Sequence, residues 1–194
     1  MPLSASDARQ LLHTRSITCQ GFYREDGLWE IEGHLTDKKS YSFENENRGR
    51  VDSGVPVHDM WIRITLDNDL LIHNVEAATD ASPYSICPNI TKNFSRLKGV
   101  IIGPGWRRKV QERLGGVHGC THLVGLLGPV ATTAYQTIFS KKAEDYKKSD
   151  LSYKEDVTED KKNRPAPRLL NSCYAFSENS SVVKERWPNF YKEE

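Results

Sequence analysis

The spacing of the apolar residues changes near residue 80, and this change limits the chain to a small number of folds. Before it, apolar residues occupy alternate positions, as in Met60, Ile62, Ile64 and Leu66, which is typical of strands with one buried face. From Pro88 onwards they recur at helical spacing. Strands followed by helices predict an α+β fold, in which a small antiparallel sheet is covered on one side.

The sequence predicts two hairpins in this sheet. Asp26-Gly27 is a two-residue turn signal between residues 16–25 and 28–37. Asp67-Asn68-Asp69 turns the chain between the second pair of strands, the later of which is predicted from Leu70 to Ala78.

Three helices are predicted to pack on the sheet. The first starts at Pro88, and the second runs from about Trp106 to Leu114. The third extends from Cys120 to about Phe139, and Pro129 within it predicts a kink or a break.

These elements predict one α+β domain, a linker and a C-terminal arm. The domain covers residues 1–140, within which the polar residues 38–56 are expected to form a loop. Residues 141–164 are dominated by Lys, Asp and Glu and are predicted to be a flexible linker. Residues 165–194 regain apolar and aromatic side chains, so we expect this arm to pack back on the domain.

Composition narrows the classes of partner. The chain has 27 basic and 26 acidic residues, a balance that gives no electrostatic basis for binding nucleic acid or an anionic membrane. The sequence shows no secretory leader and no apolar run near the ~20 residues that cross a bilayer. We therefore expect a cytoplasmic protein that binds a small molecule or a metal. In a reducing cytoplasm its four cysteines are expected to be thiols or metal ligands rather than disulfides.

The segment Gly116–His122, at the start of the third predicted helix, contains three side chains that could bind a metal or form a reactive-thiol site: His118, Cys120 and His122. Cys87 also lies at a predicted helix start, where free amides and the helix dipole stabilise a thiolate. Cys120 and His122 can reach one ligand only if Cys120 belongs to the turn, since residues two apart in a helix point roughly 200° apart.

The other histidines differ in their predicted roles. His58 is predicted to lie at the end of a row that faces the core, and Asp59 is expected to point to the opposite face unless the strand begins after it. His13, His34 and His73 are interpreted as structural or exposed.

Three functions are compatible with these residues. The first is a metal site formed by His58, Cys87, Cys120 and His122, with Cys173 as a further ligand or lid. The second is an enzyme in which Cys120 or Cys87 is the nucleophile and His122 the base, acting on a small acyl, thioester or aromatic compound. The third is a structural or partner-binding module whose cysteines belong to the core.

Several motifs resemble those of a bacterial family of unknown function. They are His13-Thr14-Arg15, Asp26-Gly27-Leu28-Trp29, His58-Asp59-Met60-Trp61, Cys87-Pro88, Gly103-Pro104-Gly105-Trp106, Gly119-Cys120-Thr121-His122-Leu123 and a stretch around Cys173. The resemblance covers about residues 13–139 and 165–191. The family commonly has histidine after the last cysteine, where this chain has Tyr174, and it brings no established activity.

More distantly, the chain resembles the NifU-type iron–sulfur scaffold proteins. These have a short antiparallel sheet, a cysteine that opens a helix ending in a Lys-Gly turn, and a second cysteine that opens a long helix. Residues 69–99 and 118–134 follow that order, with Cys87 and Cys120 matching two of the three scaffold cysteines and His58 near the third. The resemblance implies a NifU-like fold and a mixed Cys/His site for iron, an iron–sulfur cluster or zinc.

Overall fold

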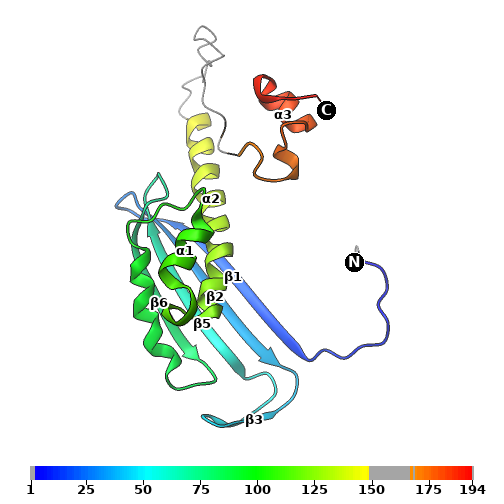
Figure 1. The fold of residues 1–194 in the computed structure, drawn as a ribbon, viewed down its shortest axis with the longest axis vertical. Coiled ribbons are helices and arrows are strands. Elements are labelled where there is room, and N and C mark those ends of the chain that lie inside the picture. Colours follow the sequence, from blue (N-terminus) through cyan, green and yellow to red (C-terminus); the bar gives the residue numbers. More distant parts are fainter. Residues whose placement is uncertain (1–2, 149–166, 168, 194) are drawn as a thin grey trace. The chain divides into compact units, whose positions relative to one another are not determined.

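The computed structural model describes residues 3–148, 167 and 169–193. The chain divides into two compact units, Met1–Asp145 and Tyr146–Glu194. The first unit combines a small antiparallel sheet with helices (Figure 1), so the predicted α+β class is confirmed.

The main sheet has four antiparallel strands in the order β1-β2-β5-β6. The strands are β1 (His13–Tyr23), β2 (Trp29–Lys39), β5 (Pro56–Leu66) and β6 (Ile72–Ala81). They form the two predicted hairpins, although most of their bounds differ from the predicted ones by a few residues. Between them, β3 (Phe43–Asn45) and β4 (Gly49–Val51) form a separate two-stranded sheet. The prediction that residues 38–56 are entirely loop is therefore wrong.

One face of the main sheet supplies half of the core. Alternate residues of β2 and β5 are almost fully buried, including Ile31, Leu35, Met60, Ile62 and Ile64. Residues between them, such as Trp61 and Arg63, lie on the opposite face and are exposed. This alternation follows from the two-residue period of a strand and is what the sequence predicted.

The helices cover that buried face (Figure 1). They are η1 (Cys87–Leu97), a 3-10 helix, followed by α1 (Trp106–Leu114), the short turn η2 (Gly116–His118) and α2 (Thr121–Lys148). Phe94 of η1 and Leu126 and Val130 of α2 are fully buried in the same core as the strands. The three predicted helices are present, but η1 is a 3-10 helix rather than an α-helix, and α2 extends beyond its predicted end near Phe139.

Pro129 does not end α2, so a break at this position is not observed. Proline removes one backbone hydrogen bond of a helix, and the adjoining Leu126, Leu127 and Val130 are buried against the sheet. This packing holds the helix on both sides of the proline. The helix continues to Lys148, so residues 141–148 of the predicted linker are helical, and residues 149–164 lie outside the described residues.

Gly33 allows α2 to approach the sheet closely. A Cβ atom at this position would lie 2.6 Å from Cγ2 of Val130 and 3.1 Å from Cγ of Leu126. Any larger residue at the centre of β2 would push α2 outwards. The glycine therefore helps to set the height of the helix above the sheet, and with it the position of the helix start.

The second unit contains short elements: η3 (Tyr174–Phe176), α3 (Ser181–Arg186) and η4 (Pro188–Phe190). Ser180 caps α3 by accepting a hydrogen bond from the Val183 amide at 3.1 Å, and the rings of Phe176 and Trp187 lie 5.3 Å apart. The expectation that residues 165–194 pack on the first unit stays a prediction. Over the described part of the chain, no helix combines the length and apolar character needed to cross a membrane.

Candidate functional site

The candidate site begins as a row of three side chains across neighbouring strands. The register of β1 and β2 places Arg15 opposite Asp37, and that of β2 and β5 places Asp37 opposite His58. All three belong to the face that the helices cover. A register shift directly after Asp37 marks a bulge in this pair of strands, a feature that often redirects side chains next to functional sites.

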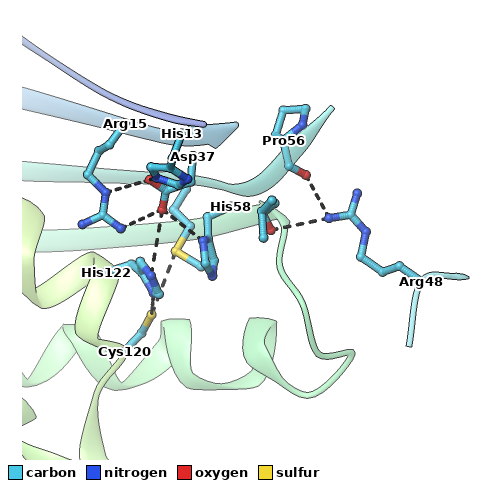
Figure 2. Close-up of polar contacts among 10 residues, drawn as sticks. His13, Arg15, Asp37, Arg48, Pro56, His58, Cys120 and His122 are labelled. Atoms are coloured by element: carbon cyan, nitrogen blue, oxygen red, sulfur yellow. Dashed lines mark hydrogen bonds and ion pairs between the residues drawn. The ribbon is translucent and has the colours of Figure 1, made fainter. Parts of the chain in front are cut away.

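Asp37 is the centre of this row, with a side chain that is 1% exposed. Arg15 donates two hydrogen bonds of 2.7 Å, from Nε to Oδ1 and from Nη2 to Oδ2. Nε2 of His13 lies 3.1 Å from Oδ1, and Nδ1 of His58 lies 3.0 Å from Oδ2 (Figure 2). A carboxylate offers about four lone-pair directions, so these contacts use its full accepting capacity.

His122 reaches the same row from the first turn of α2. Its Nε2 lies 3.9 Å from Oδ2 of Asp37, and its ring stacks on that of His58 with centroids 3.7 Å apart. Its Nδ1 faces Sγ of Cys120 at 3.9 Å (Figure 2). Cys120 directly precedes the helix and His122 lies within its first turn. This arrangement meets the condition under which the sequence allowed the two side chains to converge.

Charge and burial set the protonation of this cluster. Burial alone would raise the pKa of Asp37, but hydrogen bonds and charge from Arg15, helped by His13, outweigh it and lower the pKa to about 2. Burial lowers the pKa of His58, and the neighbouring His122 lowers it further. Burial and the charge of Arg15 likewise lower the pKa of His122. At neutral pH the site therefore holds an ionised carboxylate beside two neutral imidazoles.

A cavity of about 480 Å³ opens beside these imidazoles. Its lining residues are His58, Met60, Pro83, Tyr84, Cys87, Ile90, Gly119, Cys120, Thr121 and His122. Four of the five residues predicted as metal ligands thus line this cavity: His58, Cys87, Cys120 and His122. Cys173 belongs to the second unit and is exposed, and its role stays a prediction. All four cysteines are free thiols.

The arrangement brings together one group that could hold a metal ion among the described residues. Asp37, His58 and His122 each offer one donor atom, and these atoms lie within 4.8 Å of one another. Ionised carboxylate and neutral imidazole are the forms in which these side chains bind metals. Asp37 was not among the predicted ligands. Its odd-numbered position puts it on the core side of β2, and a carboxylate on that side is a signal of a buried charge that needs partners.

His13 is exposed, as predicted, with a side chain that is 45% accessible. Its contact with Asp37 was not predicted, because that contact depends on strand register. Asp59 points away from His58, as predicted, and lies 2.6 Å from His34 on the opposite face. His73 contacts Asp67, in the turn between β5 and β6, at 3.0 Å. These last two pairs lie outside the candidate site.

A family described as "Protein of unknown function (DUF2889)" matches residues 13–136. The chain belongs to this family. The DUF2889 region includes every residue of the candidate site and excludes Cys173. No curated protein and no solved structure matches the chain, so the resemblance to NifU-type scaffolds stays a prediction.

Proposed function

We propose that the DUF2889 region binds a transition-metal ion, with Asp37, His58 and His122 as its protein ligands. The observation that carries this proposal is the convergence of three donors in the protonation states that metals require. Protein sites for zinc and for ferrous iron both use one carboxylate and two histidines. The cavity beside these residues leaves room for a further ligand.

The contacts of Asp37 determine how an ion would enter. The oxygen Oδ2 already accepts hydrogen bonds from Arg15 and His58. A bound cation would replace the proton that His58 directs at this oxygen, and the neutral ring would carry its proton on Nε2 instead. Arg15 and His13 would then continue to hold the carboxylate in place.

Cobalt(II) titration tests the proposal, because cobalt(II) adopts zinc-like sites and has visible absorption bands. We expect one equivalent to bind to protein treated with a chelator, and His58→Ala to weaken binding by about 100-fold or more. His73→Ala is the matched control, since His73 also pairs with an aspartate, Asp67 of the turn after β5, but lies outside the cavity. Wild-type protein that binds no cobalt(II), or equal binding by the His58 variant, contradicts the proposal.

Elemental and acid-labile sulfide analysis of protein purified without oxygen would identify the native occupant. Zinc or iron at one equivalent supports a mononuclear site, whereas iron with sulfide indicates a cluster that recruits Cys87 and Cys120.

One alternative function rests on a separate observation. Cys120, His122 and Asp37 form a line, with the two nitrogens of His122 each 3.9 Å from one of the other residues. In this arrangement His122 would accept the thiol proton, Cys120 would attack a thioester or acyl carbonyl, and the leaving group would regain the proton. Water would then hydrolyse the acyl-enzyme.

Thiol labelling tests this alternative. Burial raises the pKa of Cys19, which therefore serves as an internal slow reference. We expect iodoacetamide to label Cys120 at least about tenfold faster than Cys19, and His122→Gln to slow that labelling across a pH series. Equal rates at the two cysteines, read by peptide mass spectrometry, would exclude an activated nucleophile.

A further inference from the structure

Next to Nδ1 of His122, on the side away from Asp37, lie further side-chain atoms that could bind a metal. Nδ1 of His122 and Sδ of Met60 each lie 3.9 Å from Sγ of Cys120. Met60 is 1% exposed, yet it contributes to the wall of the same cavity as Cys120 and Cys87. A thiol, a thioether and an imidazole therefore line one open cavity.

Both separations from Sγ of Cys120 fit pairs of donors that share one ion. With metal–sulfur bonds of about 2.3 Å and a metal–nitrogen bond of about 2.0 Å, a trigonal ion holds two sulfurs about 4.0 Å apart and sulfur and nitrogen about 3.7 Å apart. The observed distances of 3.9 Å differ from both by at most a few tenths of an ångström. Cys120 therefore already lies at the separation from each of the other two donors that a shared ion requires.

The donor types select a soft ion. Thiolate and thioether sulfur favour copper(I), whereas carboxylate oxygen favours harder ions. Charge supports the same choice, because Arg15 already balances Asp37 and a copper(I) thiolate adds no net charge.

We infer that Cys120, Met60 and His122 form a copper(I) site, distinct from the divalent site of Asp37, His58 and His122. Binding releases the thiol proton of Cys120 to solvent and involves no change of oxidation state. The two sites share only His122, and its neutral ring can bind one ion at a time, through a different nitrogen for each site. Each site is therefore tested with one ion alone.

Methionine methyl NMR provides a direct test on the wild-type chain. The sequence contains two methionines, Met1 and Met60, so protein labelled at the methyl carbon gives a simple spectrum in which Met1 is the reference. One equivalent of copper(I), added without oxygen, is expected to shift the Met60 methyl signal. An unchanged Met60 signal at full copper occupancy overturns the inference, including the case in which Cys87 and Cys120 bind the ion by themselves.

Competition with a copper(I) chelator gives the second readout. We expect Met60→Leu, which conserves volume and removes the thioether, to weaken copper(I) binding by about tenfold. Cys19→Ser is the matched control, because Cys19 is a half-buried thiol outside the cavity. Equal copper(I) affinity in wild type and Met60→Leu contradicts the site. Cobalt(II) titration of the same variants without copper reports separately on the divalent site.

Discussion

Replacing His122 with alanine is expected to weaken the affinity for cobalt(II) and the affinity for copper(I), each by about 100-fold or more. The reason is geometric: Nε2 faces Asp37 and Nδ1 faces Cys120, both at 3.9 Å. His58→Ala should remove only the cobalt(II) site, and Met60→Leu should affect only the copper(I) site. Titration of the three variants with both ions therefore distinguishes a ligand common to both sites from ligands that belong to one site only.

Added imidazole distinguishes a ligand from a structural residue. The His122 side chain is 26% exposed and lines the cavity, so its removal leaves a space that a free imidazole can enter. We expect imidazole to restore part of the cobalt(II) affinity of His122→Ala. His118→Ala is the matched control from the same segment, since His118 is exposed and outside the cavity. An alanine variant that retains either ion at wild-type affinity would exclude His122 from that site.

The elements of the first unit were predictable because their periods are long and regular. Apolar residues alternate along β5 from Met60 to Leu66, and the buried row of α2 continues from Leu123 to Ile138. Pro129 shows where local signals fail, because packing on both sides of it outweighs the loss of one hydrogen bond. The small strands β3 and β4 have three residues each, too few for a period to be recognised.

The site was only partly predictable because it depends on register. A two-residue turn at Asp26-Gly27 would place Lys38 opposite Arg15, whereas the observed pairing of Tyr23 with Trp29 places Asp37 there. A shift by one residue reverses the face of every side chain in a strand. Residue types therefore identified His58, Cys87, Cys120 and His122, while Asp37, Arg15 and His13 required the pairing of three strands.

Asp37→Asn is expected to lower the free energy of unfolding at neutral pH by about 2 kcal/mol and to abolish cobalt(II) binding. The figure follows from a carboxyl pKa of about 2 in the folded chain against an ordinary value of 3.8. Asparagine retains the size of the side chain, but its amide is neutral. It has one accepting oxygen and so cannot accept both charge-assisted hydrogen bonds from Arg15. Urea unfolding, with and without cobalt(II), measures both effects.

The pH dependence of the same variant gives the decisive comparison. Because folding lowers the pKa of Asp37, its contribution is complete above about pH 4 and disappears as the pH falls through about 2. The difference between wild type and Asp37→Asn should therefore shrink in acid. His58 and His122, whose pKa values are also lowered, act in a higher window: their contribution is present above about pH 6.5 and is lost below it.

Asp59→Asn provides the control on the opposite face of the sheet, where Asp59 pairs with His34. We expect this variant to bind cobalt(II) like wild type, because Asp59 has no contact with the cavity or with Arg15. A constant stability difference between wild type and Asp37→Asn from neutral to acid pH would mean that the ionised carboxylate is not what Arg15 stabilises. In that case the charge balance assigned to the site, and with it the proposed entry of a divalent ion, would be wrong.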